Sequence, residues 1–332
     1  MIELTTTETS SIGAAWPPCP SNNDRLRGFY DGGVIPADQT AVYEFTDELE
    51  AIRSSMVAES TASRLAVKAV MEDDALQLVR SFVRIEAAIP LGNGHEGLSI
   101  AYLGFNNTSR LVTDPEMATH RAQINNAVHG LQANRQHTTH TADNLAVHVH
   151  DGATADSTDI AALTPEFSQL FSVFGYSPAE TETILGDSSN LIVYMRNPDD
   201  GRIVSSAMAE TGTIAVQGLG DVTITEITEA ITPEEFRGRG YYRLVSGLLV
   251  RELCDRVANG QAIHAIFGEG NLAAAGVLRA AAQNGRRFSL QDARRYGITS
   301  SSFGVLPNSF AINDGNEPGY RSLAVSYVPG IV

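Results

Sequence analysis

Hydrophobic and polar positions in the second half of the chain alternate with the period of strands in some stretches and with that of helices in others. The predicted strands are residues 145–150, 190–197, 202–210, 221–231, 262–268 and 323–328. The predicted helices are residues 157–175, 177–186, 236–257 and 272–284. Pro-Asp-Asp-Gly at 198–201 is a strong turn signal and predicts a hairpin between the strands on either side. The pattern indicates an α/β fold.

The first half of the chain has a less regular pattern. Helices are expected at residues 47–60 and 71–82, and strands at 83–91 and 98–105 around a loop at 92–97. Residues 114–144 are polar and helical in pattern, whereas the first 40 residues are rich in Ser, Thr, Pro and Asn. We therefore expect an extended arm at 1–40, a small α/β N-terminal domain at 41–140 and a larger domain at 141–332.

Composition and charge limit the classes of partner. The 332 residues are 43% hydrophobic and 19% charged, and 39 acidic against 23 basic residues give a net charge of −16. This balance argues against a large nucleic-acid or anionic-membrane surface, so an anionic ligand would need a local basic site. Cys19 and Cys254 lie far apart in dissimilar contexts, which disfavours a disulfide framework. No leader-like or membrane-spanning stretch is present, so we expect an unanchored cytoplasmic protein.

One short segment concentrates positive charge and glycine. The predicted strand 221–231 leads into Thr-Pro-Glu-Glu-Phe, then Arg237, Gly238, Arg239 and Gly240, then an amphipathic helix that includes Arg243. A helix that starts from a glycine loop offers unpaired N–H groups and the positive end of its dipole to an anion. Guanidinium groups add charge-assisted hydrogen bonds, so the segment predicts a binding site for a pyrophosphate, which we call the anion seat.

The segment lacks the two common nucleotide patterns, because it has neither Gly-Lys-Ser/Thr nor three glycines directly after the first strand of a unit. Its Arg-x-x-Gly-x order instead resembles the pyrophosphate loop of the GNAT superfamily of N-acetyltransferases. The order of elements through the second half is similar too, with an Asn-led helix after the strand at 262–268. The stretches "TEITEAITPEEFRGRG", "IEAAIPLGNGHEGLSIAYLGF" and "LPNSFAIN" are most similar to the beta-lysine N-acetyltransferase group.

The resemblance implies a mixed, mostly antiparallel sheet flanked by helices, with acetyl-coenzyme A as co-substrate and no metal. It places the cofactor at Ile231, Arg237, Gly238, Arg239, Gly240, Tyr242, Arg243 and Asn271. The implied function is acetyl transfer to the amine of a small cationic acceptor, such as beta-lysine or another amine, by direct attack in a ternary complex. The alternatives are a module that binds acyl-coenzyme A without turnover, and an acetyltransferase for an aminoglycoside or peptide amine.

The candidate catalytic residues are Glu229, Glu226 and Tyr241. An amine attacks a thioester only when it is neutral, so a base or a water relay must take its proton. Glu226 and Glu229 are the nearest acids, and residues three apart on a strand face opposite sides unless a bulge intervenes. Two positions depart from the family pattern: Tyr242 replaces a Gly or Ala, and Leu278 replaces the tyrosine that protonates the thiolate. Tyr241 or Tyr242 could supply that missing acid.

The histidines raise a weaker hypothesis of a metal site. His137 and His140 have helical spacing, and His148 and His150 share a strand face next to Asp151. A polar connector often carries histidines, and the chemistry that the resemblance implies needs no metal, so we expect none. The first-half unit could cover the cleft, form a homodimer surface or be a decayed copy of the same fold.

Overall fold

The computed structural model describes residues 2–5, 25–30, 33–59, 64–106, 113–133, 145–298, 303–313 and 318–331. In the first half these residues form β1 (Ile2–Thr5), β2 (Arg25–Tyr30), α1 (Gln39–Glu59), β3 (Arg64–Glu72), α2 (Ala75–Val79), β4 (Ile85–Pro90), β5 (Leu98–Asn106) and α3 (Asp114–Ala133). In the second half they form β6 (Ala146–Asp151), α4 (Ser157–Phe171), α5 (Pro178–Gly186), β7 (Asn190–Arg196), β8 (Ile203–Val216), β9 (Gly220–Ile231), α6 (Tyr241–Ala258), β10 (Ala265–Asn271), α7 (Ala275–Gln283), β11 (Arg287–Phe288), β12 (Val305–Asn313) and β13 (Pro318–Tyr327).

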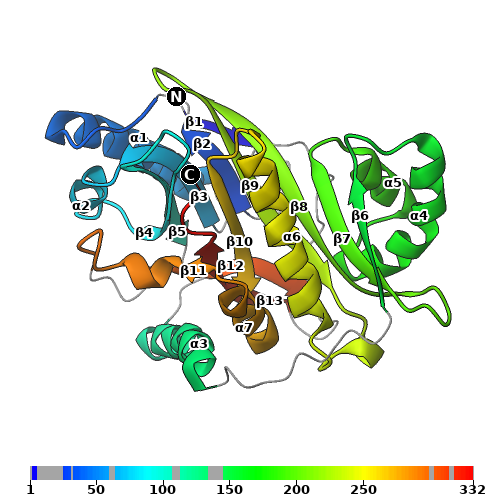
Figure 1. Ribbon diagram of the computed structural model, residues 1–332. Coiled ribbons are helices and arrows are strands. Elements are labelled where there is room, and N and C mark those ends of the chain that lie inside the picture. Colours follow the sequence, from blue (N-terminus) through cyan, green and yellow to red (C-terminus); the bar gives the residue numbers. More distant parts are fainter. Residues whose placement is uncertain are drawn as a thin grey trace.

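The described strands make two sheets that lie side by side (Figure 1). The first has the order β1-β2-β3-β5-β4, with β2 and β3 parallel and the other neighbours antiparallel. The second has the order β11-β13-β10-β9-β8-β7-β6, with β12 paired to β13. Only β9 and β10 run parallel in the described part of the second sheet. The prediction of a mixed α/β fold with a mostly antiparallel sheet flanked by helices is confirmed.

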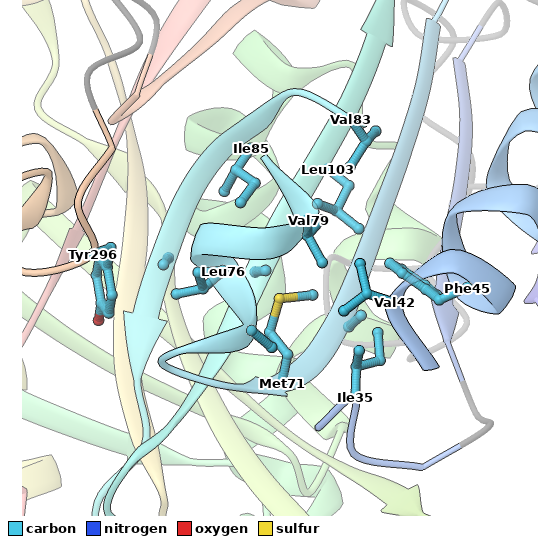
Figure 2. Packing of buried hydrophobic residues seen from close by; sticks show 14 of the residues in the cluster. Ile35, Val42, Phe45, Met71, Leu76, Val79, Val83, Ile85, Leu103 and Tyr296 are labelled. Carbon is cyan, nitrogen blue, oxygen red and sulfur yellow. The ribbon is translucent and has the colours of Figure 1, made fainter. Parts of the chain in front are cut away.

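Helices α1 and α2 cover the outer face of the first sheet. Figure 2 shows Val42 and Phe45 of α1 and Leu76 and Val79 of α2 packed around Met71 of β3. The same cluster takes in side chains from far along the chain, namely Tyr296, Ile298 and Phe303. Burial of large apolar side chains from both halves therefore stabilises this unit.

The inner face of the first sheet packs against the second sheet. Val70, Ile100 and Tyr102 of the first sheet share one buried cluster with Ile224 of β9 and Phe267 of β10. The predicted boundary near residue 140 stays a prediction, and the hydrophobic core runs across it.

The second sheet is covered differently on its two faces. Alternate residues of β7 point to opposite sides: Leu191 and Val193 pack against α6, and Ile192 and Tyr194 pack against α4 and α5. The face opposite α6 is thus covered by α4 and α5 at one end and by the first sheet at the other. Helix α7 packs against α6 and α3 and continues the layer that α6 begins (Figure 1).

Several expectations about the elements need correction. The helix expected at 71–82 is wrong at its start, because Met71 and Glu72 end strand β3 and α2 spans only Ala75–Val79. Both faces of β3 are covered, by α1 and α2 on one side and by the second sheet on the other, so its sequence lacks the alternation of a half-exposed strand. The helix expected at 236–257 begins at Tyr241, because a 3₁₀ turn at Glu234–Phe236 and the glycine loop come first.

Parts of the predicted arm are strands: β1 and β2 lie within residues 1–40, and β2 pairs with β3. Cys19 lies outside the described residues. No helix in the described part of the chain is both long enough and apolar enough to cross a membrane.

Candidate functional site

The arginine and glycine segment forms a tight loop at the N-terminus of α6. After the 3₁₀ turn, Gly238 has φ +78° and Gly240, the N-cap of α6, has φ +80°. Residues with a Cβ rarely adopt this left-handed conformation, which explains the two glycines. Gly240 supplies no capping side chain, so the first N–H groups of α6 are left for water or for a ligand. The two glycines therefore shape the loop at the N-terminus of α6, and anion binding there stays a prediction.

This loop opens into a groove of about 1170 Å³. The groove is bounded by the loop, the last residues of β9, one face of α7 and the end of α4 with the residues that follow it. Of the predicted site residues it brings together Ile231, Arg237, Gly238, Arg239, Gly240, Tyr241, Tyr242 and Arg243. Arg202 and Arg279 also line it and were missed from the sequence. Arg279 lies three residues after Gly276 and four before Gln283, a helical spacing that could have indicated a shared face.

The arginines that line the groove differ in their ion-pair and hydrogen-bond partners. Arg202 pairs with Asp200 at 2.7 Å and with Glu235 at 3.4 Å. Arg237 donates from Nε to the carbonyl oxygen of Thr232 at 3.1 Å, which leaves its terminal nitrogens for other acceptors. Within the described part of the chain, no carboxylate lies at ion-pair distance from Arg237, Arg239, Arg243 or Arg279. The loop side of the groove thus carries arginines that pair with no described carboxylate, and Glu234 and Glu235 line the groove beside them.

Strand β9 has a bulge at its end, where it reaches the groove. Thr228 pairs with Met208 and Ile231 pairs with Ser206, so two residues, Glu229 and Ala230, lie opposite one residue of β8. Glu229 has φ +34°, an uncommon conformation for a residue with a side chain. A bulge disrupts the strand ladder and re-aims side chains, and it leaves backbone N–H groups available.

The bulge separates the two candidate acids. The Glu229 carboxylate is half-buried and accepts hydrogen bonds from the hydroxyls of Thr228 and Tyr176, the latter at 3.2 Å. Its neighbours Ala230 and Ile231 line the groove. Glu226 lies in the regular part of β9, paired with Glu210 and Phe267, and is buried. Neither candidate acid lines the groove: Glu229 directly precedes two residues that do, and Glu226 lies in the interior.

Strands β9 and β10 separate just before this point. Their parallel pairing spans only Ile224–Glu226 and Ala265–Phe267, while β10 continues alongside β13 as far as Asn271. Asn271 does not line the groove, and its Oδ1 accepts from the N–H of Ala273 at 2.9 Å in the turn before α7. Leu278 is buried against α3 and also stays out of the groove.

The two tyrosines after the loop pack inward. Tyr241 and Tyr242 both pack against the core beneath α6 while lining the groove. The Tyr242 hydroxyl is hydrogen-bonded to Ser246, and burial raises the pKa of Tyr242 although the nearby positive charge of Arg286 opposes this. Tyr242 therefore packs against the core beneath α6 and also borders the groove.

The histidines do not form a metal site in the described part of the chain, where no group of three His, Cys, Asp or Glu could hold an ion. His148 stacks on Tyr194 with ring centroids 5.0 Å apart, and Nε2 of His150 lies 2.8 Å from the carbonyl oxygen of Leu185. His137 and His140 lie outside the described residues.

No family model matches the chain, and no curated protein matches it at a significant level. Among solved structures, the chain is similar to Arabidopsis thaliana NAA60 in complex with acetyl-CoA, with 11% identity and a TM-score of 0.39 over 56% of this chain and 99% of that chain. It is also similar to the ribosomal-protein-S18-alanine N-acetyltransferase from Escherichia coli, with 13% identity and a TM-score of 0.36 over 55% of this chain and 94% of that chain. A third similar structure is an aminoglycoside acetyltransferase from an uncultured soil metagenomic sample, with 8% identity and a TM-score of 0.30 over 40% of this chain and 82% of that chain. These TM-scores are too low to support a function, so the residues of the groove are the basis for the function proposed below.

Proposed function

We propose that the chain is an N-acetyltransferase that uses acetyl-coenzyme A and transfers the acetyl group directly to an amine. One observation carries the proposal: the anion seat at Arg237–Gly240 and the bulged end of β9 open into the same groove. A donor with a pyrophosphate at one end and a thioester at the other needs both features at once.

The loop would bind the pyrophosphate through the first N–H groups of α6 and through Arg237, Arg239 and Arg243. Glu229, which directly precedes the groove-lining Ala230, would take the proton that the ammonium must lose before the amine attacks, directly or through a water. A backbone N–H of β9 near the bulge would stabilise the oxyanion that forms on the acetyl carbonyl. The amine then forms the C–N bond as the C–S bond breaks, and no acyl group is held on the protein.

The acceptor side of the groove is formed by α4 and the residues after it. Leu170, Val173 and Phe174 line it, and Glu166 is already paired with Arg196 at 2.5 Å. The small cationic amine predicted from the sequence, such as beta-lysine, would place its ammonium beside Glu229. An amine of an aminoglycoside or of a peptide is the alternative acceptor. We expect the protein to act in the cytoplasm, and a homodimer stays a prediction.

The test is calorimetric binding of coenzyme A together with acetyl transfer to beta-lysine, an aminoglycoside and a peptide with a free N-terminus. Binding of coenzyme A and turnover with at least one amine would support the proposal. Binding without turnover on any amine would leave a coenzyme A-binding module in its place. No binding of coenzyme A would reject both.

A further inference from the structure

Two histidines meet where the first sheet touches the second, near the start of β9, and neither lines the groove. His95 lies in the loop 92–97 between β4 and β5, and His264 lies just before β10. Their ring centroids are 4.5 Å apart, with 44° between the ring planes. His264 is buried, with 7% of the residue exposed, and His95 is half-buried. The pair therefore joins a loop of the first half of the chain to the interior of the second half.

His264 is hydrogen-bonded to both sides of this junction. Its N–H donates to the carbonyl oxygen of Thr223 at 2.7 Å, and its carbonyl oxygen accepts from the N–H of Gly92 at 2.9 Å. Its Nδ1 accepts from the N–H of Thr223 at 2.8 Å. A backbone N–H can only donate, so Nδ1 carries no proton and the neutral imidazole has its proton on Nε2. The bond between the ring and β9 thus exists only in the neutral form of His264.

The junction is closely packed and continues into the core between the sheets. A Cβ at Gly92 would lie 1.9 Å from the carbonyl oxygen of Ile331, so a larger residue would clash there. Leu91 and Val222, which directly precede Gly92 and Thr223, belong to the buried cluster shared by the two sheets. Movement of the loop therefore exposes the apolar edge of that cluster to water.

The surroundings of His264 disfavour its charged form. Burial lowers its pKa most, the facing imidazole of His95 lowers it further, and the backbone of Thr223 opposes this change. The loop also carries Glu96, next to His95, and β9 carries Asp221, and both acids are exposed. The described residues after β13 have no ionisable side chain. Protonation of His264 would therefore create a buried charge that faces a second imidazole.

We propose that His95 and His264 form an acid-sensitive clasp that holds the loop 92–97 against the start of β9 and β10. A proton on Nδ1 of His264 removes the hydrogen bond from Thr223, and two charged rings at this separation repel each other. Free histidine titrates near about pH 6.5, so the clasp is complete above that pH and is lost as the pH falls below it, toward the lower pKa of His264 in the folded protein. This inference does not depend on the proposed function.

The test is hydrogen exchange of single backbone amides, followed by NMR at pH 7.5 and at pH 5.0 and corrected for the intrinsic exchange rate at each pH. The amides of Thr223 and Gly92 are the readout, because both donate to His264. In the wild type we expect their protection to fall by about tenfold at the lower pH, through the lost hydrogen bond and the repulsion. In His264→Asn, which keeps an acceptor for Thr223 and does not titrate, their protection should not depend on pH. In His95→Asn the fall should be smaller, because the facing charge is absent.

Two controls separate the clasp from a general effect of acid. The amide of Gly152, bonded to the carbonyl oxygen of Asn190 on β7, should keep its protection at both pH values. The variant His129→Asn removes an exposed histidine from α3 and should retain the wild-type fall. Protection at Thr223 that is unchanged by pH in the wild type, or that falls equally in His264→Asn or at Gly152, would overturn the inference. If His264→Asn fails to fold, the wild type and His95→Asn decide, and an equal fall in these two would also overturn it.

Discussion

The double variant Arg237→Ala, Arg239→Ala tests the anion seat, and the structure sets the size of its effect. Both side chains are exposed, and neither pairs with a described carboxylate, so their removal breaks no ion pair in the described structure. Arg237 keeps only its terminal nitrogens for a ligand, since Nε already donates to Thr232. Charge-assisted hydrogen bonds contribute about 1.5–3 kcal/mol, and exposure to solvent and salt reduces that figure. About 1 kcal/mol for each arginine gives a loss of about 2 kcal/mol.

We therefore expect the dissociation constant for coenzyme A to rise by at least about tenfold, the equivalent of 1.4 kcal/mol. Calorimetry at low and at moderate salt would measure it, and the loss should be larger at low salt. Arg251→Ala is the control, since this exposed arginine lies on the same helix and does not line the groove. Affinity that is unchanged in the double variant would show that the loop is only a helix start.

Three further outcomes are expected. Glu229→Gln should lower turnover by about 10²–10⁴ and remove the basic group from its pH profile, and an unaltered profile would move that role to Glu226 or to water. Glu86→Gln leaves the buried Arg64 without its charged partner at 2.5 Å, so the free energy of unfolding in urea should fall by about 3–5 kcal/mol, whereas a loss below 1 kcal/mol would contradict this. Burial raises the pKa of Tyr296 from its ordinary value to about 12. Because the folded state holds this proton more tightly, its contribution is complete below about pH 10 and is lost between about pH 10 and 12, on the order of 3 kcal/mol. In Tyr296→Phe the decline of unfolding free energy over that range should be shallower, and an identical slope would refute the assignment.

Local chemistry made the loop predictable. Gly238 and Gly240 mark positions that need a positive φ, and the arginines around them mark an anion seat, so neighbouring residues alone carry that information. Most of the strands and helices from residue 145 onward were predictable from short apolar runs and helical periodicity bounded by turn residues, although β7 and much of β8 are buried on both faces. Strand β3 was missed because its burial on both faces removes the alternation of a half-exposed strand.

Features that depend on partners far along the chain could not be predicted. The bulge at Glu229 is a mismatch between β8 and β9, and the sequence of β9 alone shows only that two acids are three residues apart. In the sequence, Arg286 is a charged residue after a predicted helix, with nothing to indicate burial. Its burial depends on how α7 packs beside β10. Gly268 has no side chain and so leaves room for the Arg286 guanidinium. A glycine at this position in the sequence indicates such a contact only once its neighbour is known.

The shared core of the two sheets has a consequence for how the protein unfolds. Tyr296, Ile298 and Phe303 belong to the same buried cluster as residues of α1, α2 and β3, although more than 200 residues separate them along the chain. The first sheet therefore cannot melt without exposing apolar surface that the last third of the chain provides, and the second cluster couples the sheets again. We expect heat or denaturant to unfold both sheets in a single cooperative transition. A fragment cut near residue 140 would lose part of the core of both sheets.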